Sequence, residues 1–377
     1  MNLSPVTYQI LFNSKNITKD ISEHLLALNY TDKVEGEADE LELILQDSQA
    51  LWQNEWYPEK GATIEAKIID DDVELPCGKF SLDEKEFSGG KSEGDTFRIA
   101  GVSASITKKL RTKRSVAHEN KTLRQLAQTV ADRHGLKLQG TIPDITIGRV
   151  TQYRKTDLAF LSTISSRYGL VFSVRGDILT FHKQTDLEKK KHSLSLDRTE
   201  VTSFKFLDKS ETAFESVKVS YHNPETDTLV EKTGGPVPDD FEGSADDYTD
   251  NDKAENDQQA ELMAQSQQRK IVTRVQTVSF ECPGNVLLVS GNNVELTGFG
   301  KPSGIYHITE SKHSLQKDSS YITSCEAKRV DPVPPAKYKP KKKIPADAIK
   351  VFNADGPGYR LATYKRVGNE EILTYIN

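Results

Sequence analysis

The sequence predicts an α+β fold that is mainly β, with two related β-barrel domains, an inserted α+β block and an extended C-terminal arm. Three observations lead to this prediction. Short apolar–polar alternations fill residues 1–105 and return in residues 206–335. Between them, residues 106–205 change to a helical period. The last segment, residues 336–377, is basic and follows neither pattern.

The first region has the pattern of a small barrel or sandwich. Alternation predicts a strand over residues 6–12, where Tyr8, Ile10 and Phe12 share one side, and residues 41–45 form a second apolar run. Acidic or Gly-rich turns separate the strands that follow. We expect these strands at residues 61–69, at residues 78–82 with Phe87, and at residues 97–102.

The inserted block begins with an amphipathic helix over residues 122–134, which Gly135 ends. A short apolar stretch follows at residues 136–142. A basic cluster at residues 108–114 precedes this helix. This cluster lacks interleaved aromatic residues that would stack on a base, which favours a solvated loop or a protein-contact surface over an anion site.

A compact helix–strand–strand unit spans residues 152–182. Thr156 is the expected N-cap, and Asp157 places a carboxylate in the first turn, where the positive end of a helix favours it. Gly169 is expected to end the helix in a left-handed conformation. Two short strands, at residues 170–174 and 178–182, complete the unit. It contains no obvious reactive group.

The third region starts with a strand over residues 214–221. An acidic excursion, residues 223–261, then carries thirteen Asp and Glu against two Lys. Its glycines and prolines predict little regular structure, so we interpret it as a solvated loop on the outside or near a partner's basic surface. A polar helix is expected over residues 254–269, before the strands resume. Further strands are expected at residues 271–281, 285–289, 293–297, 304–312 and 321–328.

The basic C-terminal arm has nine Lys and Arg against four Asp and Glu from residue 337 onward. Such a segment cannot build a large core alone. Residues 349–352 and 372–376 could pair as strands. We interpret the arm as a segment that orders on a partner, or as a linker with a small docking element.

Composition limits the class of protein. Of the 377 residues, 36% are hydrophobic and 28% are charged, so two or three domains with a large polar surface are expected. A net charge of −6 argues against general nucleic-acid binding. There is no apolar run of 18 residues and no secretory signal at the N-terminus. Three widely spaced cysteines, Cys77, Cys282 and Cys325, indicate a reducing compartment without a disulfide framework.

A search for chemical motifs assigns no catalytic, cofactor-binding or metal-ligating residue, and nothing in the chain requires an enzyme. The phosphate loop and His-Glu-x-x-His are missing. His307, His313 and Cys325 could form a zinc site if neighbouring strands bring them together. Histidines bonded to the backbone are the alternative that we favour. The acidic residues 246–252 lack the Gly and the terminal Glu of a calcium loop.

Several short motifs gain meaning in combination. In the inserted block they are Gln152-Tyr153, Asp157-Leu-Ala-Phe160-Leu161, Tyr168-Gly169-Leu170 and Leu179-Thr-Phe181. In the third region they are Ala260-Glu-Leu-Met-Ala264, residues 287–298, Tyr306-His-Ile308-Thr309 and His313-Ser-Leu. Their order and spacing resemble the late control protein D family of phage tail baseplate hubs and the N-terminal hub portion of VgrG spike proteins. The resemblance covers about residues 1–330.

This resemblance implies a structural role. Such hubs are homotrimers in which two related barrels per subunit make a pseudo-sixfold ring, and the ring adapts a hexameric tail tube to a trimeric spike. The implied partners are copies of this chain, the tail tube protein, a separate central spike protein and other baseplate proteins. No nucleic-acid sequence recognition and no stable membrane insertion are implied. The implied location is the virion tail baseplate or an equivalent injection particle, assembled in the bacterial host cytoplasm.

Two other functions remain as alternatives. One is a cell-wall-degrading enzyme of the tail. The other is a carbohydrate-binding module in which Trp52 and Trp56 stack on sugar rings. For these two tryptophans, partial burial beside the first barrel is the interpretation that we favour. The C-terminal arm, in the hub interpretation, is a candidate tether to the spike or to another baseplate component.

Overall fold

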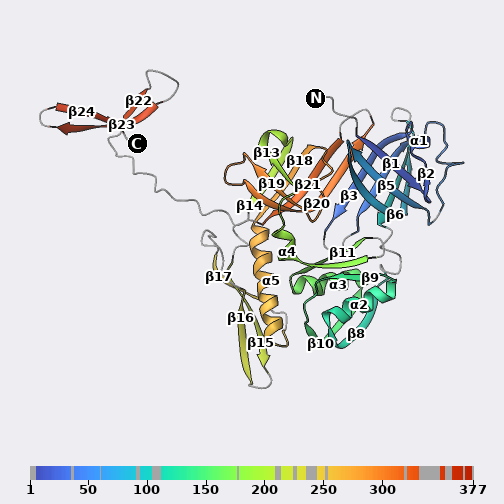
Figure 1. The fold of residues 1–377 in the computed structure, drawn as a ribbon, viewed down its shortest axis with the longest axis horizontal. Helices are drawn as coiled ribbons and strands as arrows, with labels where there is room; N and C mark the ends of the chain where they lie inside the picture. The colour runs from blue at the N-terminus through green and yellow to red at the C-terminus, as the bar shows by residue number, and fades with distance from the viewer. Residues whose placement is uncertain are drawn as a thin grey trace. The chain divides into compact units, whose positions relative to one another are not determined.

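The computed structural model of the chain is shown in Figure 1. It describes residues 6–34, 38–59, 61–90, 94–103, 112–175, 178–208, 214–223, 227–234, 244–250, 254–317, 321–330, 349–352, 359–367 and 370–375. The chain divides into two compact units, Met1–Pro332 and Val333–Asn377. Each unit is described by itself.

Thirteen described strands of the first unit share one large sheet. The predicted α+β, mainly β class is therefore confirmed. The strands of this sheet are β1 (Thr7–Phe12), β2 (Lys15–Asn16), β3 (Leu25–Lys33), β4 (Glu40–Gln46), β5 (Thr63–Asp70), β6 (Val73–Ser88), β7 (Thr96–Ser103), β13 (Leu194–Asp197), β14 (Ser203–Asp208), β18 (Gln276–Pro283), β19 (Asn293–Thr297), β20 (Gly304–Gln316) and β21 (Tyr321–Arg329).

The sheet contains the same order of six strands twice. The first half runs β3-β4-β7-β6-β5-β1, and the second runs β14-β18-β21-β20-β19-β13. Each strand of the first half has a counterpart at the same place in the chain order of the second. One pairing differs, because β1 is antiparallel to β5 whereas β13 is parallel to β19. The two β regions are thus two versions of one topology.

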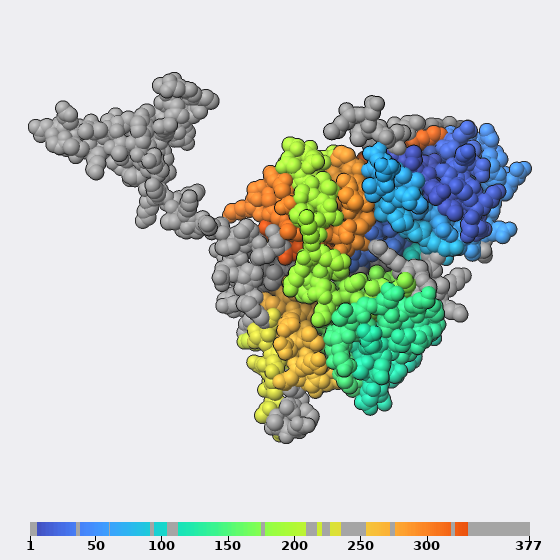
Figure 2. Space-filling model, in the orientation of Figure 1, coloured from blue at the N-terminus to red at the C-terminus, as the bar shows by residue number. Residues whose placement is uncertain are grey.

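The two halves join where β3 pairs with β20. We call this pairing the seam: residues 27–33 of β3 lie antiparallel to residues 310–316 of β20. Each half has its own hydrophobic core, with Leu41, Phe80 and Phe97 in the first and Phe280 and Tyr306 in the second. In Figure 2 the blue and orange surfaces meet along one boundary, as this pairing requires.

Strand alternation in the sequence locates most of these elements. Leu41, Leu43 and Leu45 are buried and their neighbours face outward, as period-2 patterning requires. One strand was missed and two expectations were wrong. Residues 25–33 form β3, which was not predicted. Residues 271–275 belong to a helix, not a strand, and residues 285–289 form turns.

The inserted block packs two helices against short strands. In α2 (Leu123–His134), Thr122 and Gln125 form a reciprocal capping box, and Gly135 ends the helix at φ 68°. The second helix is α3 (Asp157–Arg167), with Thr156 as its N-cap, as predicted. The strands are β8 (Arg114–Thr122), β9 (Lys137–Gly140), β10 (Thr146–Lys155), β11 (Leu170–Arg175) and β12 (Ile178–Lys183).

The acidic excursion contains more regular structure than its composition predicts. Within it, β16 (Thr228–Thr233) and β17 (Ser244–Asp250) form a small sheet with the preceding strand β15 (Phe214–Asn223). The predicted polar helix is α5 (Asp257–Val275), and its Ala260, Met263 and Ala264 enter the same core as α2 and α3. The prediction of little structure was wrong because α5 supplies a surface on which β15 and β16 pack.

Short helices complete the first unit: α1 (Thr18–Ile21), α4 (Gln184–Glu188) and the 3-10 helix η1 (Arg198–Glu200). The second unit is an antiparallel sheet of β22 (Ile349–Phe352), β23 (Tyr359–Val367) and β24 (Glu370–Tyr375). The two segments predicted to pair with each other instead both pair with β23. Across the described residues, no helix has the length and apolar character needed to cross a membrane.

Candidate functional site

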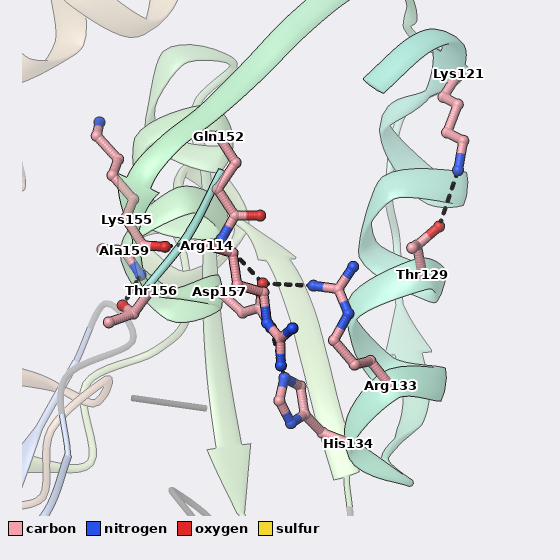
Figure 3. A network of polar contacts seen from close by, with 10 residues as sticks. All are labelled: Arg114, Lys121, Thr129, Arg133, His134, Gln152, Lys155, Thr156, Asp157 and Ala159. Carbon is pink, nitrogen blue, oxygen red and sulfur yellow. Dashed lines mark hydrogen bonds and ion pairs between the residues drawn. The ribbon is translucent and has the colours of Figure 1, made fainter. Parts of the chain in front are cut away.

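Figure 3 shows a buried carboxylate inside the inserted block. Asp157 is the first residue of α3 and has no exposed surface. Its Oδ1 accepts hydrogen bonds from Arg133 at 2.6 Å and from Gln152 at 3.0 Å, and its Oδ2 accepts one from His134 Nε2 at 2.7 Å. Arg114 Nε lies 3.4 Å from Oδ2. One carboxylate therefore connects β8, β10, the end of α2 and the start of α3.

The surroundings keep this carboxylate ionised. Burial alone would raise the pKa of Asp157, but hydrogen bonds from His134, Gln152 and Arg133, together with the charge of Arg133, hold the pKa below its usual value. Both oxygens are occupied and the group has no access to solvent, so the arrangement does not suit a general acid or base. It suits a tie between secondary-structure elements.

The position of Asp157 on the predicted helix already indicates this buried contact. Asp157 lies on the same helical face as Phe160, Leu161 and Ile164, all of which are buried. A carboxylate at that position must find partners in the interior. One partner, Arg114, is the last residue of the basic cluster at residues 108–114, of which residues 108–111 lie outside the described ranges.

A second polar tie joins the inserted block to the second half of the sheet. Glu188, at the end of α4, is buried and forms an ion pair with Arg269 of α5. Asn293 of β19 donates its Nδ2 to three carbonyls in residues 187–190, at 2.7 to 3.2 Å. The Oδ1 of Asn293 accepts a hydrogen bond from His307 Nδ1 at 2.8 Å. The connection between block and sheet is therefore held by side chains as well as by the chain itself.

The three candidate zinc ligands have separate surroundings. His307 bonds to Asn293, whereas His313 donates Nε2–H to the Leu288 carbonyl at 3.0 Å and accepts from the Tyr321 hydroxyl at 2.7 Å. Burial lowers the pKa of both histidines to about 4, so both are neutral near pH 7. Cys325 is a buried free thiol whose pKa burial raises. The described residues contain no group of three or more His, Cys, Asp or Glu arranged to hold a metal ion.

The two tryptophans divide between core and surface. Trp52 is 5% exposed and stacks on Phe97, with ring centroids 6.3 Å apart. Trp56 is 38% exposed and meets Trp52 edge to face. Only one of the two is therefore free to act as a surface platform. The acidic residues 246–252 considered for calcium lie partly outside the described ranges, as residues 251 and 252 are not described.

Two strand edges of the sheet lack a described partner and carry exposed apolar side chains. β14 ends the strand order, and no described strand pairs with its outer side. Phe204 and Leu207 of β14 are 40% and 41% exposed, and the Arg198 guanidinium lies 4.3 Å from the centre of the Phe204 ring. The second half of β6 pairs with β7 alone, and Phe87 there is 47% exposed. Exposed edges with apolar side chains are typical of protein-contact surfaces.

Comparison with known proteins places this architecture among tail proteins. Residues 86–319 match the family model for the phage tail baseplate hub (GPD). A probable baseplate hub protein of Escherichia phage P2 is 29% identical over 179 residues, which are 47% of this chain and 45% of that protein. The match spans less than half of that relative's length. The resemblance inferred from the short motifs is confirmed.

Solved structures share the fold at low sequence identity. The 43 kDa tail protein of prophage MuSo2 from Shewanella oneidensis has a TM-score of 0.63 and 13% identity, covering 86% of this chain and 98% of that one. A chain of the Francisella PdpA–VgrG complex has a TM-score of 0.53 and 10% identity, covering 100% of this chain and 73% of that one. This chain therefore shares its fold with a chain of that complex.

We expect Asp157→Asn to destabilise the protein by roughly 3 kcal/mol, because Arg133 and Arg114 would then face an uncharged amide. Denaturant unfolding measures the change. Asp132→Asn, at an exposed site on α2, is the matched control and should shift stability by less than about 0.5 kcal/mol. The penalty should shrink as pH falls through the lowered pKa of Asp157, where the parent carboxylate gains a proton. Equal destabilisation by Asp157→Asn and Asp132→Asn would contradict the role of Asp157 in joining these secondary-structure elements.

The buried histidines predict a pH dependence of stability. An unfolded histidine titrates near pH 6.5, whereas His307 and His313 titrate at about 4 when folded, so the unfolded state binds more protons between these values. Stability should therefore fall as pH decreases from about 6.5 to about 4, by about 3 kcal/mol for His313 alone. Denaturation midpoints of the parent and of His313→Gln should converge over this window. Parallel pH profiles would argue against the burial of a neutral His313.

Proposed function

Because this chain belongs to the phage tail baseplate hub (GPD) family, we propose that it is the structural hub of the baseplate in a phage tail or a related contractile injection particle. In finer detail, three copies form a ring around the particle axis. The ring adapts the sixfold symmetry of a tail tube to the threefold symmetry of a central spike.

The repeated strand order is the observation that carries this proposal. Each chain presents the order β3-β4-β7-β6-β5-β1 and its counterpart β14-β18-β21-β20-β19-β13 in one sheet. Three such chains present six equivalent sheet halves to a sixfold tube, while the inserted block and the excursion occur once per chain and keep threefold symmetry. A chain with one barrel would need six copies to do the same.

The described polar clusters support a role without catalysis. Asp157, Glu188 and His313 are buried, and each is used in ties between elements rather than in an open cleft. The proposed partners are the tail tube protein, the central spike protein and other baseplate proteins. The basic arm, residues 336–377, is a proposed tether to one of them, and the particle is assembled in the bacterial host cytoplasm.

Mass and symmetry measurements test this proposal. We expect native mass spectrometry to give a trimer, alone or with the cognate spike protein, and low-resolution images to show a threefold ring with a central channel. A monomer under both conditions would refute the ring. Zymography on peptidoglycan should show no clearing, and lysis by the purified protein would instead favour the cell-wall-degrading enzyme.

A further inference from the structure

The seam inside one chain provides a template for a contact between chains. In the seam, the second half of β20 pairs with β3. The counterparts of these strands in the repeated order are β6 and β14. Neither has a described strand on the corresponding side: β14 ends the order, and no described strand pairs with residues 84–88 of β6 on the side that β5 occupies farther back. Each chain therefore carries one completed seam and the two unpaired halves of another.

A shared irregularity aligns β6 with β20 residue by residue. The pairing of β20 with β21 shifts register between Ile308 and Glu310. The pairing of β6 with β7 shifts in the same way between Leu82 and Glu84. Because a bulge leaves one residue unpaired at a fixed place, Glu84 corresponds to Glu310 and Phe87 to His313.

The registers across the sheet likewise align β14 with β3. Leu43 of β4 and Phe280 of β18 are counterparts, since their partners Ile99 and Cys325 hold equivalent positions in β7 and β21. Leu28 pairs with Leu43, and Phe204 pairs with Phe280. Leu28 and Phe204 are therefore equivalent. Three residues farther along the two strands, Thr31 is equivalent to Leu207, and at the next position Asp32 is equivalent to Asp208.

We propose that β14 of one copy pairs antiparallel with residues 84–88 of β6 in a neighbouring copy, in the register of the seam. In the seam, Asp32 faces Ser311, Thr31 faces Lys312 and Tyr30 faces His313. Transferring these pairs places Lys85 opposite Asp208, Glu86 opposite Leu207, Phe87 opposite Phe206 and Ser88 opposite Lys205 of the neighbouring copy. This inference rests on the proposed ring and names the contact that closes it.

The side chains brought together by this register are complementary. Lys85 and Asp208 carry opposite charges, and cross-strand pairs of opposite charge stabilise a sheet. Phe87 and Phe206 would repeat the aromatic contact of the seam, where the rings of His313 and Tyr30 stack with centroids 6.0 Å apart. A register shifted by one residue would lose both matches, because it turns each side chain to the opposite face.

The contact also accounts for exposed apolar groups. Phe87 and Leu207 are 47% and 41% exposed in the single chain, and both lie in the proposed strand pair. Lys85 is already held at this edge, since its Nζ donates to the Pro58 carbonyl at 2.7 Å and lies 3.9 Å from the centre of the Tyr57 ring. Because β14 and residues 84–88 of β6 are two different edges of the same chain, the contact is head to tail and closes a ring when the rotation allows.

Disulfide trapping tests the register. The variant Glu86→Cys with Leu207→Cys places two thiols opposite each other between copies, and mild oxidation should give covalent oligomers up to the trimer on a non-reducing gel. The matched control, Thr31→Cys with Lys312→Cys, occupies the equivalent pair of the seam and should cross-link within one chain. Glu84→Cys with Lys205→Cys is four residues out of register and should give no oligomer. The native thiols are buried and do not compete.

A charge exchange gives a second, independent readout. Lys85→Asp should raise the trimer dissociation constant about tenfold through like-charge repulsion with Asp208, and adding Asp208→Lys should restore it. If mass measurements show a trimer but neither cross-linking at residues 86 and 207 nor charge rescue occurs, this register is wrong and the proposed hub stands. A monomer in every preparation would instead remove the hub proposal and this contact together.

Discussion

The pairing of β3 with β20 is the constraint on which the rest of this structure depends. It joins two sheet halves of identical strand order, so the two hydrophobic cores are held in one unit by a continuous ladder of backbone hydrogen bonds. Side chains reinforce it: Ser314 donates to Asn29 at 2.7 Å, and the buried Asp32 accepts from the Ser290 backbone at 2.9 Å. Because a strand accepts only one partner on each side, this junction also decides which edges are left for other chains.

Both large insertions leave the repeated sheet at connections between its strands. The inserted block lies between β7 and β13, and the acidic excursion with α5 lies between β14 and β18. The corresponding connection in the first half, between β3 and β4, spans only residues 34–39. The insertions then build a shared core, in which Phe160 and Leu161 of α3 join Ala260 and Met263 of α5. Additions of this kind enlarge the protein without changing the strand order of the sheet.

The sequence predicted those elements that are determined by interactions between neighbouring residues. The apolar run at residues 41–45 and the capping of α3 by Thr156 are properties of neighbouring residues, and both were predicted. The β-branched residues within 271–275 favour a strand, but α5 continues to Val275, so local propensity predicted the wrong element there. Asp157 depends on Arg133 from another helix, which no local window contains. The sequence predicted two related β regions but not which strands correspond, because equivalent positions hold different residues, such as Thr31 and Leu207. Only strand pairing reveals their equivalence.

Five buried polar groups lie at junctions between elements. Asp32 and His313 lie at the seam, Asn293 and Glu188 lie between the block and the sheet, and Asp157 lies between the elements of the block. A hydrophobic contact tolerates small sliding, whereas a buried hydrogen bond is lost when its partners move by about 1 Å. Polar groups at junctions therefore fix the relative positions of elements that apolar packing alone would leave free to shift. In the proposed hub, which would pass load from a tube to a spike, this placement favours stiffness at the points where bending would begin.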